Sequence, residues 1–315
     1  MRRFIQLIIF AQSIILSAQE TLPIYQQYLL RGKFWINPAY YGATDSVEFD
    51  ANYHRQFSKF DTSPNVQSIG IHANIVDRVG TGISLFRDQN GAISSNGISV
   101  GASYFVPITD DGRRNQFSFG ANVNFYNASI DHSRINAKDS DDPLLSTGAN
   151  SIFNTYTNLG LQATYEGFFG GVSILDIPLS DERLIINGIE PLPTKYVMNA
   201  GYDYEITEGF SVEPSFLLNL NTNSARLMDI NILAKIYDDD NSLIGGVSFR
   251  SAKDKSIANQ LSISPLVQVK VNSWHFGASY HISMGKIAPY GGNSFMLSLG
   301  YSLDNFINPR GFRIR

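Results

Sequence analysis

Residues 97–101 read Gly-Ile-Ser-Val-Gly and match G-x-S-x-G, a motif that presents a nucleophilic serine in many hydrolases. In those enzymes the serine stands on a sharp turn between a strand and a helix. Here the motif lies within a run of alternating apolar and small residues, and no helical pattern follows it. We therefore interpret Ser99 as a strand residue and expect no hydrolase activity.

Histidine and aspartate offer little more for catalysis or metal binding. The five histidines are scattered; His275 and His281 share a face of one predicted strand but lie roughly 20 Å apart. Asp139, Asp141 and Asp142 are clustered, as Ca²⁺ ligands can be, but the spacing of an EF-hand is absent. We interpret them as a solvated acidic loop. The sequence predicts no enzyme, no metal site and no cofactor.

Composition excludes several classes of protein. The 315 residues are 43% hydrophobic and 17% charged, with a net charge of −4 and no cysteine. So little charge with 21 Phe and 16 Tyr excludes intrinsic disorder, and a mean hydropathy of −0.10 is too polar for a helical membrane bundle. The absence of a basic block argues against nucleic acid as a partner. Without cysteine there is no disulfide, thiolate site or lipoprotein anchor.

The first residues predict a secretory signal peptide over 1–18. Arg2 and Arg3 precede an apolar stretch over 4–16, and Ser17 and Ala18 supply small residues for cleavage. A transmembrane anchor needs roughly 20 apolar residues, more than this stretch offers. Since no other long apolar run follows, the exported chain is expected to be either soluble or a β-barrel in the outer membrane.

Along most of the remaining sequence, apolar residues alternate with small or polar residues, with a period of two. From Phe117 to Phe125 every second residue is apolar, and the residues between are Ser, Gly or Asn. Such alternation predicts a strand with one apolar face and one polar face. Fourteen such runs lie near 47–57, 66–76, 79–88, 95–106, 115–126, 155–165, 168–175, 196–206, 209–219, 227–237, 242–251, 259–269, 272–283 and 294–303.

The connections between these runs alternate in length. We expect short turns after the even-numbered strands, such as Asp77-Arg78 and Glu166-Gly167, and longer loops after the odd-numbered strands. Short periplasmic turns, longer extracellular loops and an even strand count are typical of outer-membrane barrels, whereas a soluble β-sandwich need not sort its loops. The sequence therefore predicts an all-β, 14-stranded antiparallel transmembrane barrel over 47–303. Residues 19–46 would form an N-terminal periplasmic segment, and 304–315 a short periplasmic tail.

Glycines recur on the face that would line the barrel. They either serve strand curvature or let an inserted segment approach the wall closely. That segment could be the loop at 127–154, the stretch 19–46 or a part of a partner. The candidate positions for close approach are Gly70, Gly101, Gly120, Gly201, Gly277 and Gly300.

Several short motifs carry a family resemblance. They are Gln-Gln-Tyr at 26–28, Ile-Asn-Pro-Ala-Tyr-Tyr-Gly at 36–42, Tyr-His-Arg-Gln-Phe at 53–57, Gly-Thr-Gly at 80–82 and Asp-Gln-Asn-Gly at 88–91. Together they resemble the PorP/SprF family of type IX secretion system outer-membrane proteins. The N-P-A-Y-x-G box is the most specific piece. Phe57 stands where the family pattern has Trp.

The resemblance implies an outer-membrane component that assists export or surface anchoring of a cargo or adhesin. It implies that cargo, other secretion-system proteins and outer-membrane lipid are the partners. A porin or uptake channel for small solutes or hydrophobic molecules is the alternative. Within the box, Pro38 favours an extended Asn37 and Gly42 permits positive φ, so the box reads as a turn. Asn37, Pro38, Ala39, Tyr40 and Gly42 are candidates either to anchor the N-terminal segment or to contact a partner.

Overall fold

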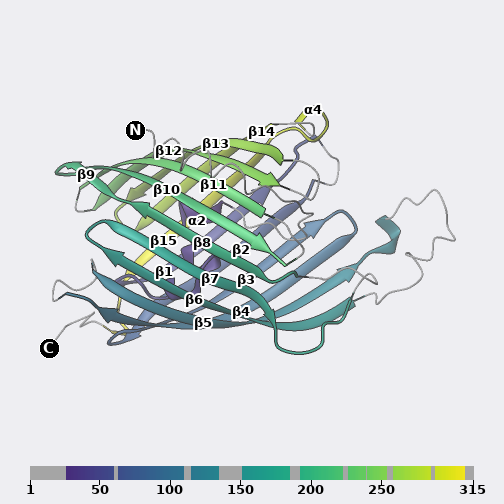
Figure 1. Ribbon diagram of the computed structural model, residues 1–315, viewed down its shortest axis with the longest axis horizontal. Coiled ribbons are helices and arrows are strands. Elements are labelled where there is room, and N and C mark those ends of the chain that lie inside the picture. Colours follow the sequence, from purple (N-terminus) through teal and green to yellow (C-terminus); the bar gives the residue numbers. More distant parts are fainter. Residues whose placement is uncertain are drawn as a thin grey trace, which may run out of the picture.

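A computed structural model shows a closed β-barrel (Figure 1). It describes residues 26–59, 63–109, 115–134, 151–184, 192–222, 226–238, 240–253, 258–284 and 288–308. The predicted signal peptide, the acidic cluster at 139–142 and the end of the predicted tail lie outside these residues. Among the helices of the described chain, none has the length and apolar character to span a membrane.

All but two strands of the wall have ten to fifteen residues, a length that crosses a bilayer when tilted. The strands are β1 (Ser46–Arg55), β2 (Asn65–Val76), β3 (Val79–Asn90), β4 (Ile93–Pro107), β5 (Gln116–Ile130), β6 (Ser151–Tyr165), β7 (Phe168–Pro178), β8 (Lys195–Tyr202), β9 (Tyr204–Thr207), β10 (Phe210–Asn221), β11 (Arg226–Tyr237), β12 (Asn241–Lys253), β13 (Ala258–Val271), β14 (Trp274–Ser283) and β15 (Ser294–Asp304). The exceptions are β8, with eight residues, and β9, with four.

These fifteen segments make fourteen wall strands, because β8 and β9 are two parts of one strand that is interrupted at Asp203. Both parts pair with β10. Neighbours pair antiparallel in sequence order, and β1 closes the barrel by pairing with β15 from Ser46↔Asp304 to Arg55↔Phe295. Closure removes the free edges of the described wall except at β9, which extends past the β6–β7 turn and pairs only with β10. Hydrocarbon would not tolerate an open edge within the membrane. The predicted 14-stranded antiparallel barrel is confirmed.

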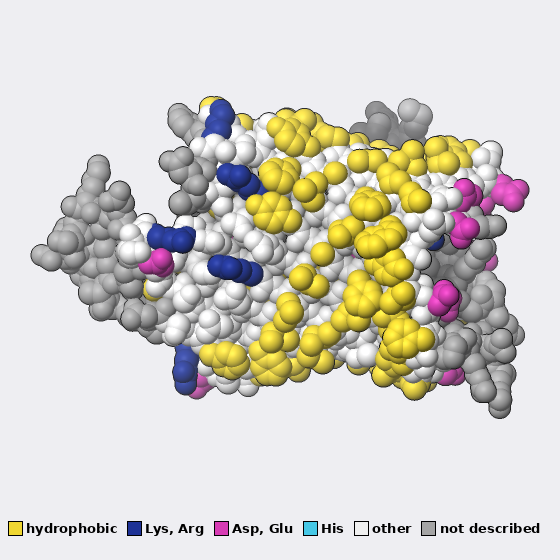
Figure 2. Space-filling model, turned by 180° about the vertical axis from the view of Figure 1, so that it is seen from behind, with side chains coloured by type: hydrophobic (Ala, Val, Ile, Leu, Met, Phe, Trp, Pro, Cys, Tyr) yellow, Lys and Arg dark blue, Asp and Glu magenta, His cyan; other side chains and the backbone are white. Residues whose placement is uncertain are grey.

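The two faces of each strand differ as the alternation predicts. On β4, Ile98 and Val100 point outwards and are 44% and 46% exposed, whereas Ser99 between them is buried in the lumen. Figure 2 shows the outward apolar side chains spread over the barrel wall, with most Lys and Arg towards one end and most Asp and Glu towards the other. Ser99 thus lies mid-strand, without the turn and helix that a catalytic serine elbow requires.

The connections follow the predicted alternation with two differences. Turns at 77–78, 166–167, 208–209 and 272–273 have two residues each and lie at one end, which we call the short-turn end. The connection after β3 is also only two residues long, because Gly91 adopts φ +60° and lets β3 and β4 extend to a tight hairpin. Conversely, the short-turn-end connection at 108–115 is longer than predicted. We call the opposite end the long-loop end.

Depth in the bilayer should decide the cost of a charge on the outer face. Val100→Arg, at the centre of β4, is expected to destabilise the folded barrel by about 2–4 kcal/mol, since a guanidinium there faces hydrocarbon. Val106→Arg, on the same face near the strand's end, should cost about 0–1 kcal/mol. Denaturant unfolding of both variants in lipid vesicles measures the difference. Equal effects would contradict a membrane-spanning wall.

Candidate functional site

The chain before β1 lies inside the barrel, where it forms what we call the plug, residues 26–45. It contains the short helices α2 (Gln27–Leu30), η1 (Lys33–Trp35) and η2 (Pro38–Tyr40). Figure 1 shows this purple segment surrounded by the strands. Phe34 is 2% and Tyr41 1% exposed, as in a protein core. The described part of the predicted periplasmic segment is therefore in the lumen, because its aromatic side chains pack against the inner wall.

The beginning of the plug binds the strands in the second half of the barrel. The Tyr28 hydroxyl donates to Asp229 Oδ2 on β11 at 2.8 Å, and Gln26 Nε2 donates to Ser248 Oγ on β12 at 2.6 Å. Asp229 is fully buried and also accepts two hydrogen bonds of 2.7 Å from Arg250. Such charge-assisted bonds are stronger than neutral ones and fix the position of this end.

Arg31 ties the plug to the strand at which the barrel closes. Its guanidinium forms ion pairs with Glu48 and Asp50, two lumen-facing carboxylates on β1. Burial alone would lower the pKa of Arg31, but the charges of Asp50 and Glu48 outweigh burial and raise it. Ser302 on β15 donates to Glu48 Oε2 at 2.7 Å, so the network spans the β1–β15 junction. Removing one partner of a buried ion pair typically costs about 3–5 kcal/mol.

The same network reaches the end of the plug through a histidine. The Gly42 N–H donates to His72 Nδ1 at 3.3 Å, which leaves the proton on Nε2. That nitrogen lies 3.5 Å from Asp50 Oδ2. Gly42 adopts φ +62°, and a side chain there would meet the backbone of Ala73 and Gly80. Gly42 is therefore needed both for the turn and for the close approach.

The N-P-A-Y-x-G box packs its backbone onto the first half of the barrel. Asn37 caps η2 by accepting from the Ala39 N–H at 3.0 Å, and its Nδ2 donates to the Leu161 carbonyl on β6 at 2.9 Å. Ser103 Oγ donates to the Tyr41 carbonyl at 2.5 Å. Asn37, Pro38 and Ala39 are buried, whereas Tyr40 is half-buried. This geometry suits an anchor for the plug.

Five of the six predicted close-approach glycines face the plug, and the nearest plug residue can be given for each. A Cβ atom would lie 2.6 Å from Phe34 at Gly70, 2.4 Å from Tyr41 at Gly101, 2.4 Å from Pro38 at Gly120, 3.3 Å from Leu30 at Gly277 and 2.5 Å from Arg31 at Gly300. Gly201 instead accommodates the ring of Phe169, which projects from β7.

Other glycines of the wall also face the plug, although they were not among the six predicted close-approach positions. Gly80 would place a Cβ 1.9 Å from the Tyr41 carbonyl, and Gly171 would place one 2.9 Å from the Asn37 amide. The Gly-Thr-Gly spacing at 80–82 carried a signal for this contact, since both glycines share the inward face. The loop at 127–154 is a second predicted occupant of the lumen. Its residues 127–130 belong to β5 and 151–154 to β6, and 135–150 lie outside the described residues.

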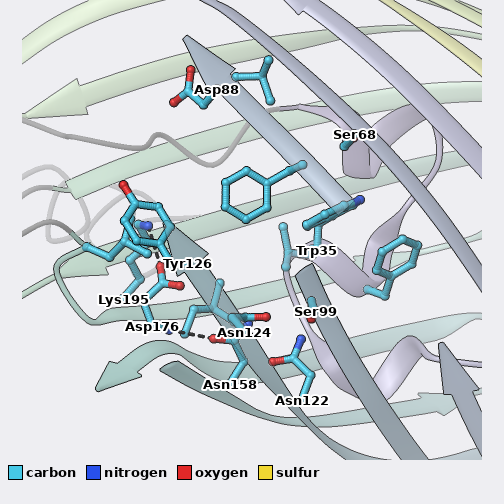
Figure 3. A pocket seen from close by; sticks show the side chains of 16 residues that line it. Trp35, Ser68, Asp88, Ser99, Asn122, Asn124, Tyr126, Asn158, Asp176 and Lys195 are labelled. Carbon is cyan, nitrogen blue, oxygen red and sulfur yellow. Dashed lines mark hydrogen bonds and ion pairs between the residues drawn. The ribbon is translucent and has the colours of Figure 1, made fainter. Parts of the chain in front are cut away.

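A cavity remains on each side of the plug. The one towards the long loops, which we call the long-loop cavity, has a volume of about 130 Å³ (Figure 3). Trp35, Phe86 and Tyr126 line it with aromatic rings, and Lys195 Nζ donates to Asp176 Oδ2 at 2.8 Å on one side. It lies between the plug and strands β2 to β8 and is open on one side.

The cavity at the short-turn end, the short-turn cavity, is larger at about 740 Å³. Its charged lining has four carboxylates and two lysines: Glu166, Asp203, Glu205, Glu213, Lys33 and Lys235. Lys235 lies 2.7 Å from Asp203 and 2.5 Å from Glu213 and is shared between them. Four carboxylates and two lysines give the cavity a formal charge of −2. Within the described residues, no cluster of His, Asp or Glu is arranged to hold a metal ion.

Comparisons with known proteins agree with this architecture. The family model for "Type IX secretion system membrane protein PorP/SprF" matches residues 17–301. No curated protein matches the chain significantly.

Similar solved structures are outer-membrane channels. The CymD monoaromatic hydrocarbon channel has a TM-score of 0.53 at 13% identity, covering 90% of this chain and 94% of its own. The Ralstonia pickettii toluene transporter TbuX has a TM-score of 0.52 at 11% identity, covering 86% and 92%. At these identities the similarity concerns the fold.

The fit between plug and wall can be tested with one added side chain. Gly120→Val should destabilise the barrel by about 1–3 kcal/mol, because its side chain would collide with the plug backbone at Pro38. Gly245→Val on β12 is the matched control, since a Cβ there meets nothing within 4 Å. Denaturant unfolding in detergent compares the two. A Gly120→Val barrel as stable as the control would contradict direct plug–wall contact.

The double variant Asn37→Ala with Pro38→Ala distinguishes anchoring from partner contact. The variant loses the Asn37 bond to the Leu161 carbonyl and the Asn37 cap of η2, and we expect a loss of about 1–3 kcal/mol in barrel stability. Limited proteolysis should then cut the plug faster. Thr44→Ala, at the exposed end of the plug, serves as the control. A fully stable double variant that fails to export its partner would instead identify the box as a partner contact.

Proposed function

Because the chain belongs to the PorP/SprF family of type IX secretion system membrane proteins, we propose that it is a non-catalytic docking barrel of that system. In this role it assists the export or the surface anchoring of a partner cargo or adhesin. Its localisation follows from the family and the fold: it is a β-barrel of the outer membrane, with the short turns on the periplasmic side.

The observation that carries the proposal is the seated plug. Passage of a solute along the lumen would require the plug to leave the wall, and with it the ion pairs of Arg31 to Glu48 and Asp50. Releasing the plug would give up both of these charge-assisted interactions, at about 1.5–3 kcal/mol each. That cost is comparable to much of the stability of an ordinary domain, about 5–15 kcal/mol. A barrel filled in this way is better suited to present two binding faces than to conduct.

The short-turn cavity supports a role for the periplasmic face. It is wide enough to admit side chains of another protein, and it combines excess carboxylates with the rings of Tyr40, Phe169 and Tyr204. Aromatic residues are enriched at protein interfaces, and charge complementarity steers association. We propose that other secretion-system proteins contact the barrel at this face.

A deletion strain tests the role in export. Cells lacking this protein should remain intact and lose particular proteins from their surface, as measured by mass spectrometry of surface and culture fractions. Restoring the gene should restore those proteins. Flux of small solutes through the purified barrel in liposomes, with an unchanged set of surface proteins in the deletion strain, would instead identify an uptake channel.

A paired charge reversal tests the periplasmic face. Glu205→Lys should reduce recovery of co-purifying secretion-system proteins from a tagged barrel, because it reverses charge in the short-turn cavity. Glu208→Lys changes the same charge in the same hairpin turn without lining that cavity, and should leave recovery unchanged. Equal recovery with both variants, in barrels that remain folded, would contradict docking at this cavity.

A further inference from the structure

We propose that the long-loop cavity is a binding site for a small organic cation, an ammonium or guanidinium group on a compact apolar or aromatic body. The long-loop cavity lies on the side of the plug opposite the short-turn cavity, and the inference does not depend on the proposed role in secretion. It rests on one buried carboxylate, the rings around it and the size of the space (Figure 3).

Asp88 is the charge that a ligand would neutralise. It lies on β3, faces the lumen and is 6% exposed. Its neighbours across the strands are Val66 and Ser95, and the Ser95 hydroxyl is engaged with Tyr126 at 2.8 Å. Among the described residues, the Asp88 carboxylate forms no hydrogen bond or ion pair. A carboxyl that is shielded from water and has no partner favours its neutral form, and a cation that reaches it stabilises the ionised form.

The other charges of the cavity compensate each other. Lys195 and Asp176 form an ion pair of 2.8 Å, and Figure 3 shows that pair well apart from Asp88. The charged side chains that line the cavity are these three, so their formal sum is one negative charge, −1 for Asp88, −1 for Asp176 and +1 for Lys195. The cavity therefore favours a single positive charge.

Aromatic rings form one part of the surface that a cation would meet, and the amides of Asn122, Asn124 and Asn158 form another. Trp35 from the plug lies edge-on to Phe86, with ring centroids 6.3 Å apart, and Phe86 is stacked near Tyr126 at 6.3 Å. The Phe86 ring occupies space left by Gly97, where a Cβ would lie 2.1 Å from it. Faces of aromatic rings attract cations, most strongly when water is excluded. The plug thus contributes directly to this site through Trp35.

The volume sets the size of the ligand. A cavity of about 150 Å³ accepts benzene in a well-studied case, and this one measures about 130 Å³. The space is somewhat smaller than that but open on one side, so one ring or a short alkyl chain with a single cationic group is the largest ligand that it takes. Benzylammonium is therefore a suitable probe, and benzyl alcohol is a neutral probe of nearly the same shape.

Tryptophan fluorescence reports binding at this site. The chain has two tryptophans, Trp35 in the cavity and Trp274, which is 48% exposed on the outer wall. In a Trp274→Phe barrel purified in detergent, benzylammonium should change Trp35 emission with a saturable curve. Benzyl alcohol should bind at least tenfold more weakly, because it cannot neutralise Asp88.

Asp88→Asn in the same background should raise the dissociation constant for benzylammonium at least tenfold. Asn has nearly the same shape, and retention of the heat-dependent gel shift of a folded barrel shows that the variant is assembled. Asp238→Asn, in a turn at the opposite end, is the matched carboxylate control and should bind as the parent does. Absence of saturable binding by benzylammonium, equal binding of benzyl alcohol, or an unchanged constant in folded Asp88→Asn would each overturn the proposal.

Discussion

The ion pairs between Arg31 and the two carboxylates of β1 are the interaction on which the interior of the barrel depends. Glu48 and Asp50 face a lumen that holds protein in place of bulk water, so their charges need a partner within it. Arg31 supplies that partner and at the same time fixes the plug beside the β1–β15 junction. From this point the plug extends one way to Asp229 on β11 and the other way to Leu161 on β6.

Lipid on one side and the plug on the other explain the two faces of the wall. Outward positions such as Ile98 and Val100 are apolar because hydrocarbon offers no hydrogen-bond partner and an apolar side chain needs none. Inward positions are small where the plug backbone lies against the strand, as at Gly120, and polar where it needs hydrogen bonds, as at Ser103. The resulting lumen is a packed interior with a cavity at each end, which is consistent with a protein that binds partners within a secretion system.

The barrel could be predicted from the sequence because the alternation records which side of the wall each residue faces. The strands from β1 to β15 lie close to the predicted runs, and differences such as the extended β3–β4 hairpin arise from local turn geometry at Gly91. The inward glycines signalled close approach but could not say what approaches. Gly120 meets the plug and Gly201 meets Phe169, although both have the same sequence context of a small inward residue.

The path of the plug could not be predicted, because it has no periodic pattern and its contacts join residues far apart in the chain. Tyr28 and Asp229 are separated by 201 positions, and Asn37 and Leu161 by 124. The Asn-Pro-Ala-Tyr motif indicated a turn, whereas its place in the lumen depends on glycines of three other strands, Gly120, Gly160 and Gly171. Asp88 likewise read as one residue of a short motif, and its burial beside Trp35 becomes evident only in three dimensions.

The position of Gly300 has a consequence for assembly. This residue belongs to the last strand of the chain, yet it leaves room for Arg31, which is among the first residues of the plug. Gly277 on the preceding strand does the same for Leu30. The seat of the plug is therefore complete only when synthesis and insertion of the final hairpin have finished. Until then Leu30 and Arg31 lack their places against the wall, so the plug can be fully seated only after the barrel has closed.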